Sequence, residues 1–304
     1  METHSTGKRL PISAVLIMLT LCILWGANMA AIKIGSQMLA PVFSAFTRSV
    51  LATICLALWM RMRKIPFFPD RVTVLHGCVV GIIFAVEFGC IYLGMKFTLA
   101  SRAYLLLYTH PFFVALGGHY LLHQDRLSAR KIIGLCLAFG GVALLFAKDW
   151  GELSAETLPG DLLFLLGGFL WAATSIYVKK YLAVRAEGVQ TLFYHLFFSI
   201  PLLLPMSLLI DEKIYLGFNW PGFWAQLYQG VIVAFASYVV WFEMLHRHTA
   251  SLLTAYTFFA PVFGVAISGW LILGEPVTGG LIICLLMVAS GMVVMNPPKA
   301  TQSS

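Results

Sequence analysis

Residues 12–34 read ISAVLIMLTLCILWGANMAAIKI, and residues 160–181 read GDLLFLLGGFLWAATSIYVKKY. Each stretch is long and apolar enough to cross a bilayer, whose hydrocarbon core of about 30 Å requires about 20 helical residues. Trp25 matches Trp171 and Lys33 matches Lys179 at the same shift of about 146 residues. These matches predict two related halves, each starting with a membrane-spanning helix.

The repeat continues toward the C-terminus at a shift of 150 residues. The matching positions are Ala100-Ser101 with Ala250-Ser251, Pro111 with Pro261, Phe113 with Phe263, Asp125 with Glu275 and Gly141 with Gly291. Each half holds an odd number of predicted spans, so the two halves must lie in the bilayer in opposite orientations. Such inverted repeats are common in secondary transporters.

The composition is that of an integral membrane protein. The chain is 60% hydrophobic and 11% charged, whereas soluble domains carry about 25% charged residues. Hydropathy predicts ten spans, at residues 12–34, 41–60, 73–95, 100–122, 129–147, 160–181, 189–210, 224–245, 250–272 and 277–295. We expect an all-α membrane protein with ten transmembrane helices, built from inverted five-helix repeats at 12–147 and 160–296. The first apolar run is interpreted as a retained helix rather than a cleaved signal peptide.

The distribution of Lys and Arg predicts the orientation. If both termini are cytoplasmic, 14 of the 20 basic residues lie on the inner side and 5 on the outer side, and Arg48 lies inside a span. This bias predicts a multi-pass protein of the inner (plasma) membrane with both ends in the cytoplasm. The net charge of +7 then reflects basic residues that face anionic lipid at one membrane surface. No nucleic-acid partner is needed to account for it.

The ordered motifs resemble the drug/metabolite transporter superfamily, in particular its EamA-type members. The first half carries Trp25-Gly26-Ala27-Asn28, Lys33, Arg48, Ala100-Ser101, Pro111 and Gln124-Asp125-Arg126-Leu127, and the second carries Trp171, Lys179, Ala250-Ser251, Pro261 and Gly274-Glu275-Pro276. Gln124-Asp125 replaces the usual Gly-Glu, but the carboxylate remains. The resemblance implies a ten-helix bundle whose central cavity exports or imports small metabolites, without naming the metabolite.

Two ionisable residues lie deep inside predicted spans. By helical rise, Arg48 lies about 10 Å and Glu87 about 12 Å from the outer ends of their helices. Such residues mark a transport pathway or pair with each other, so we expect both to approach each other or to face one water-filled cavity. Glu87 is a candidate for substrate binding or proton coupling if substrate or a conformational change separates it from Arg48. The alternative is a static ion pair that joins the two helices.

The repeat extends this pair to the second half. Arg48 matches His195 at a shift of 147, and Glu87 matches Ser237 at a shift of 150. The two pairs are candidates for outer and inner constriction points of an alternating-access protein. The simpler alternative for His195 is a buried histidine with one hydrogen bond.

Aromatic and polar side chains complete the predicted cavity. The further candidates are Trp25, Asn28, Tyr104, Tyr108, His110, Trp171, Tyr238 and Trp241. Aromatic rings can enclose an organic solute while a few polar atoms orient it; for each single aromatic residue, ordinary packing is the alternative. Pro111 and Pro261 occupy equivalent helices and are candidate hinges, or they only shape the cavity.

These features favour a secondary transporter of small organic metabolites, amino acids or related compounds, working in the export direction by alternating access. The sequence has no Gly-x-x-x-x-Gly-Lys-[Ser/Thr] motif, so energy would come from the solute gradient or a coupled proton. We expect no catalytic activity, cofactor or metal site, because no Cys-x-x-Cys pair or membrane-enzyme motif is present. An integral-membrane enzyme acting on lipid-linked substrates and a passive channel are the alternatives. The sequence leaves dimer formation open.

Overall fold

The fold is described by a computed structural model, which covers residues 10–94, 97–98, 106–122, 125–145, 156–267 and 279–296. In these ranges the secondary structure is helical, mostly α with two π-helical segments and one 3-10 turn, and one isolated β-bridge joins Leu39 and Tyr215. The helices are α1 Ile12–Gly35, α2 Pro41–Arg63, α3 Arg71–Gly94, α5 His110–Leu121, α6 Ala129–Leu145, α7 Leu158–Tyr177, η2 Val178–Leu182, α8 Gly188–Phe197, α9 Ile200–Ile210, α10 Trp220–Leu227, η3 Tyr228–Ser237, α11 Tyr238–Arg247, α12 Ala250–Ala255, η4 Tyr256–Phe258, α13 Phe259–Ala266 and α14 Gly279–Met295.

Six helical segments in the described ranges are long and apolar enough to cross a membrane. They are Ile12–Gly35, Pro41–Arg63, Arg71–Ile91, Leu158–Leu182, Gly188–Ile210 and Trp220–Arg247. The remaining four expected spans overlap the shorter helices α5, α6, α12 to α13, and α14, and parts of these spans lie outside the described residues. The prediction of an all-α, multi-pass membrane protein is therefore confirmed.

Several spans are interrupted rather than straight. The eighth expected span joins α10 to α11 through the π-helical η3, and the seventh is divided between α8 and α9. Pro111 lies at the start of α5, directly after the turn at residues 108–109. Pro261 lies in α13, just after the 3-10 turn η4. Proline has no backbone N–H to donate, so it is compatible with positions where the regular helical hydrogen bonding is interrupted. The hinge role of both residues stays a prediction.

The helix contacts follow the repeat. When each helix of a contacting pair is replaced by its counterpart in the other half, the result is again a contacting pair. The packing of α5 on α7 has its counterpart in α13 on α1, and α2 on η3 has its counterpart in α8 on α3. The pair α6 and α14 and the pair α5 and α12 each relate equivalent helices to one another. This pattern is what a two-fold relation between the two repeats produces.

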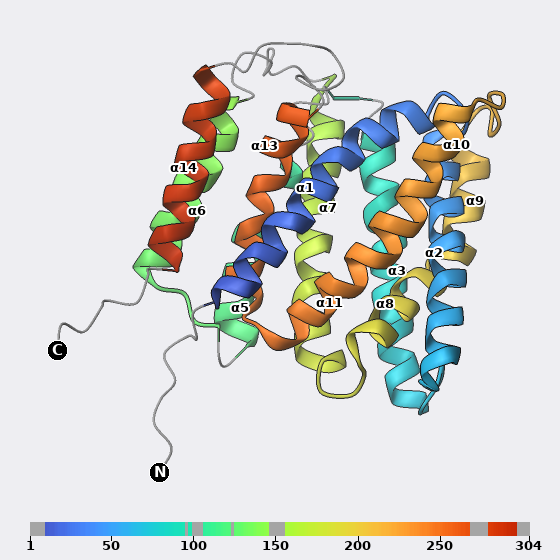
Figure 1. The fold of residues 1–304 in the computed structure, drawn as a ribbon, viewed down its shortest axis with the longest axis horizontal. Helices are drawn as coiled ribbons and strands as arrows, with labels where there is room; N and C mark the ends of the chain where they lie inside the picture. Colours follow the sequence, from blue (N-terminus) through green and yellow to red (C-terminus); the bar gives the residue numbers. More distant parts are fainter. Residues whose placement is uncertain are drawn as a thin grey trace.

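Equivalent helices run in opposite directions (Figure 1). Asn296 donates its side-chain N–H to the carbonyl oxygen of Leu10 at 3.3 Å, so α1 begins where α14 ends; we call this the lower end. Thr98 donates its hydroxyl to Asp161 at 2.6 Å, so α7 begins beside the last residues of α3, at the opposite, upper end. α1 thus rises and α7 descends, as an inverted repeat requires.

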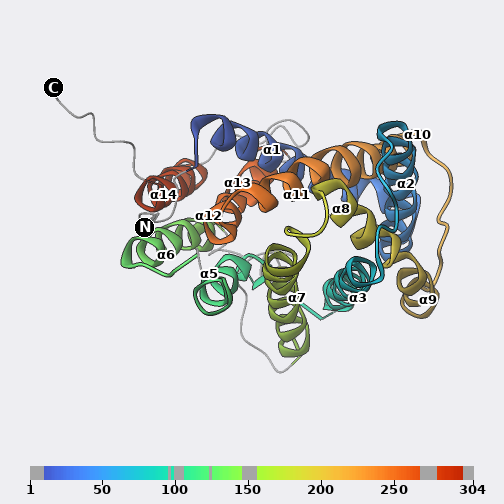
Figure 2. The same cartoon turned by 90° about the horizontal axis from the view of Figure 1, so that it is seen from below.

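Close helix approach holds the periphery together. A Cβ atom on Gly291 of α14 would lie 2.5 Å from the carbonyl oxygen of Gly134 in α6, so the two helices touch through their backbones. Seen from below, α6 and α14 form one edge of the bundle and α9 lies at the other (Figure 2). The remaining helices surround the centre.

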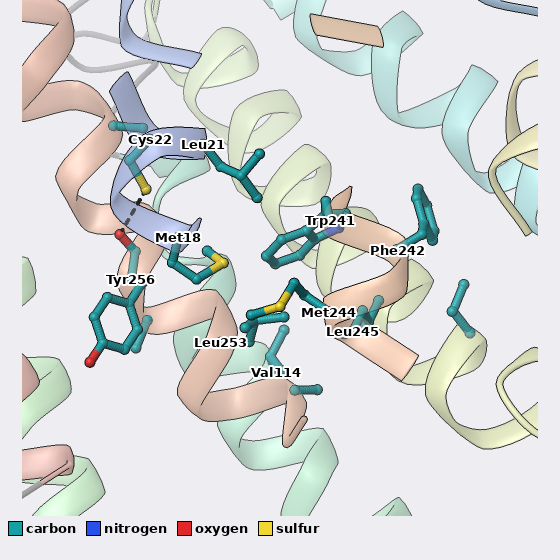
Figure 3. Packing of buried hydrophobic residues seen from close by; sticks show 14 of the residues in the cluster. Met18, Leu21, Cys22, Val114, Trp241, Phe242, Met244, Leu245, Leu253 and Tyr256 are labelled. Atoms are coloured by element: carbon teal, nitrogen blue, oxygen red, sulfur yellow. Dashed lines mark hydrogen bonds between the residues drawn. The ribbon is translucent and has the colours of Figure 1, made fainter. Parts of the chain in front are cut away.

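The lower half of the centre is an apolar core. Met18 and Cys22 of α1 face Leu253 and Tyr256, and the Cys22 thiol donates to the Tyr256 carbonyl oxygen at 3.2 Å (Figure 3). Trp241 and Leu245 of α11 lie on the other side of this cluster.

At the start of α3, outside the spans, hydrogen bonds from Thr73 hold the pKa of Asp70 below its usual range.

Candidate functional site

A cavity of about 230 Å³ lies between the two halves. Its wall is formed by α1, α2, α3, α7, α8, η3 and α11, with residues 107–108 that precede α5. Nine of the residues predicted from the sequence line it, namely Trp25, Asn28, Arg48, Glu87, Tyr108, Trp171, His195, Tyr238 and Trp241. Their role in binding stays a prediction.

Arg48 is the most unusual group in this wall. It is 3% exposed, and its guanidinium lies over the ring of Phe88 at 4.8 Å and beside the hydroxyl of Tyr238. Its Nε and Nη2 atoms are buried and have no hydrogen-bond partner among the described residues. The site therefore offers two unused donors and a positive charge. A buried cation without a full set of partners is costly.

Glu87 lines the same cavity and is 6% exposed. Within the described ranges, the ion pairs closer than 4 Å are Lys131 with Asp125 and Arg247 with Glu243. Arg48 and Glu87 therefore share one cavity without forming a contact ion pair, and the static pair considered as an alternative is not formed. A guanidinium and a carboxyl group thus face a common space.

An aromatic cluster forms another part of the wall. The Trp25 ring meets Trp241 edge to face at 5.4 Å and Tyr238 at 6.0 Å. Its indole N–H donates to the Ser237 hydroxyl at 3.0 Å, and this hydroxyl donates to the Val233 carbonyl oxygen at 2.6 Å. Ser237 is thus placed behind Trp25 as its hydrogen-bond partner rather than in the cavity wall.

His110 is likewise behind the wall. Its ring stacks on Trp171 at 3.8 Å, and its Nε2 lies 3.3 Å from the hydroxyl of Thr257. Tyr108 lines the cavity and meets Trp171 edge to face at 6.2 Å. Tyr104 lies outside the described residues. Trp171 therefore presents its ring to the cavity with His110 as its support.

The sequence interpretation missed eleven wall residues, among them Phe84, Phe88 and Thr174. Phe84 and Phe88 are one turn apart on α3, with ring centroids 4.3 Å apart, and Phe84 lies 4.1 Å from His195. Thr174 is the repeat counterpart of Asn28 at the shift that relates Trp25 to Trp171. That shift was the signal that could have identified it.

Polar contacts connect the helices at the lower end. The Lys179 ammonium donates to the carbonyl oxygens of Leu245 and His246 at 2.9 and 2.7 Å, which joins η2 to the end of α11. Asp125, which is 2% exposed, accepts from the Ser251 backbone N–H at 2.8 Å and from the Ser251 hydroxyl. The Asp125 contacts join the two halves below the cavity, whereas the Lys179 contacts join two helices of the second half.

Comparison with known proteins agrees with this architecture. An uncharacterized transporter of Archaeoglobus fulgidus is 31% identical over 255 residues, which are 82% of this chain and 85% of the relative. Probable amino-acid metabolite efflux pumps of Salmonella typhimurium and Escherichia coli are each 24% identical, over 91% of this chain and 92% of the relative.

The comparisons also cover fold and family. A solved crystal structure shares the fold with a TM-score of 0.80, at 18% identity and over 94% of this chain and 97% of that one. The EamA-like transporter family matches residues 12–147 and 158–296, a range in each half. The chain therefore belongs to the EamA-like transporter family.

Proposed function

We propose that this protein is a secondary transporter that exports small carboxylate-bearing metabolites, amino acids or related compounds, through its central cavity by alternating access. We place it in the inner (plasma) membrane with both termini in the cytoplasm. The observation that carries the proposal is the Arg48 guanidinium, whose buried Nε and Nη2 are unpaired in the cavity wall. The names of the two efflux-pump relatives support the direction and the solute class.

The chemistry of the cavity fits a zwitterion. A guanidinium binds a carboxylate through two parallel N–H···O bonds, and Arg48 has two free donors for it. Glu87 faces the same space and suits the solute's ammonium group, or it takes up a coupled proton after the solute leaves. The volume of about 230 Å³ is below the range of about 300–1,000 Å³ typical of drug-sized ligands, which favours a single small solute.

Alternating access would use the relation between the two halves. The lower end is joined by Lys179 and Asp125, so opening the cavity downward requires these contacts to break. Pro111 and Pro261 lie beside helix breaks at equivalent positions and are the proposed bending points. The solute gradient, or a proton carried by Glu87, would supply the energy.

Counterflow in proteoliposomes tests the proposal. Purified protein would be reconstituted with a panel of unlabelled amino acids inside, and entry of the same labelled compounds would be followed. Saturable counterflow is expected for amino acids but not for the amines that lack their carboxylate. Arg48→Gln should reduce it by roughly 10- to 100-fold, because charge-assisted hydrogen bonds are lost.

Arg63→Gln is the matched control, because Arg63 is on the same helix and also lies over an aromatic ring, Trp59 at 4.9 Å, but is exposed. Glu87→Gln should keep exchange while removing its pH dependence if Glu87 carries the proton. A monodisperse protein without counterflow of any amino acid, or equal losses in Arg48→Gln and Arg63→Gln, would refute the proposal.

A further inference from the structure

The polar groups of the cavity lie in two layers. Asn28 and Glu87 each stand seven residues before the upper ends of α1 and α3, and Arg48 stands seven residues after the upper start of α2. At 1.5 Å per residue, each is about 10 Å along its helix from the upper end. We call these three residues the upper layer; it contains the arginine and the glutamate of the cavity wall.

The repeat produces a second layer nearer the lower end. His195, the counterpart of Arg48, stands seven residues above the lower start of α8, and Thr174, the counterpart of Asn28, stands eight residues before the lower end of η2. We call Thr174 and His195 the lower layer; it is neutral and polar. The Phe88 and Phe84 rings bridge the layers, since Phe88 contacts Arg48 and Phe84 contacts His195.

The lower layer has hydrogen-bonding capacity that the protein does not use. Among the described residues, eight buried side-chain polar atoms have no hydrogen-bond partner, and five of these belong to Asn28, Arg48, Thr174 and His195, which all line the cavity. In the lower layer they are the Thr174 Oγ1 and the His195 Nδ1. A buried polar atom left unpaired is strongly unfavourable, so both atoms require a polar group from whatever fills the cavity.

We propose that Thr174 and His195 form a specificity subsite for a neutral, hydrogen-bonding side chain, a hydroxyl or an amide, of the transported amino acid. This inference rests on the proposed function, in which Arg48 holds the carboxylate in the upper layer. An apolar isostere would leave Thr174 and His195 unpaired and is therefore rejected. The first half thus binds the charged groups of the solute, and the second half binds its side chain.

Pairs of amino acids with nearly the same shape test the subsite. In the counterflow assay, L-threonine would be compared with L-valine and L-asparagine with L-leucine. The wild type is expected to favour the polar member of each pair by about tenfold in half-saturating concentration, the effect of one to two hydrogen bonds. Thr174→Val and His195→Leu should each reduce the preference below about threefold. His195→Asn, which keeps a polar atom near the Nδ1 position, should retain it.

Thr53→Val is the matched control. Thr53 on α2 is also buried with an unpaired hydroxyl, but it is not in the cavity wall. The same substitution there should leave the preference unchanged. If amino acids are transported but the wild type shows no polar preference, or if Thr53→Val abolishes it as Thr174→Val does, the subsite is refuted while the transport function stands. If no amino acid shows counterflow, the proposed function fails and the subsite with it.

Discussion

Asp125→Asn should weaken the lower end of the bundle by about 2–3 kcal/mol in free energy of unfolding. The Asp125 carboxylate is almost fully buried and accepts from Ser251 and from the Lys131 ammonium at 2.5 Å. An asparagine replaces one acceptor oxygen by an NH₂ group, so one of the facing N–H donors loses its partner. A charge-assisted hydrogen bond contributes about 1.5–3 kcal/mol, and breaking a fully buried pair costs about 3–5 kcal/mol. Lys131 is 17% exposed, so its ammonium group can be hydrated when it loses the carboxylate. The expected loss of unfolding free energy therefore lies near the lower of these two ranges.

Unfolding by SDS titration in mixed micelles, followed by tryptophan fluorescence, measures this difference. Glu243→Gln is the control, because it makes the same carboxylate-to-amide change in an ion pair with Arg247 whose side chains are 42% and 70% exposed. Exposed pairs contribute about 0–1 kcal/mol, so that variant should stay close to wild type. Equal effects of the two substitutions would refute the reasoning that burial makes the Asp125 contacts stabilising.

Two further predictions concern the closure and the periphery of the bundle. Lys179→Met removes the cation that holds the end of α11 and should therefore open the lower end. A cysteine placed at Ser175 in the cavity wall, in a variant without native cysteines, should then react faster with an impermeant maleimide added at the lower face. Lys180→Met should not change this rate, and equal rates in both variants would contradict a closing role for Lys179. Gly291→Ala forces a Cβ against the backbone of α6 and should lower the free energy of unfolding by about 1–3 kcal/mol, whereas Gly140→Ala, whose Cβ would meet only the flexible end of Met287 at 3.4 Å, should be neutral or stabilising. A stable Gly291→Ala protein would show that the helices are not in backbone contact.

Local properties of the chain were sufficient to predict the fold class and the repeat. Crossing a bilayer requires long apolar helices, and such runs are visible in the sequence. The duplication follows from ordered matches such as Trp25 with Trp171. An ionisable residue inside an apolar run is conspicuous for the same reason, so Arg48 and Glu87 were identifiable as candidates without any contact information.

Which side chains meet depends on how each helix is rotated and packed against its neighbours, and only the tertiary structure decided that. His110 and Ser237 were expected in the cavity, but the packing places them behind Trp171 and Trp25. Thr174 reaches the cavity wall because α7 turns that face inward, and its threonine side chain is otherwise unremarkable in an apolar helix. The two-layer arrangement of charged and neutral polar groups exists only after the inverted repeats are packed together, because it combines side chains that are about 150 residues apart in the chain.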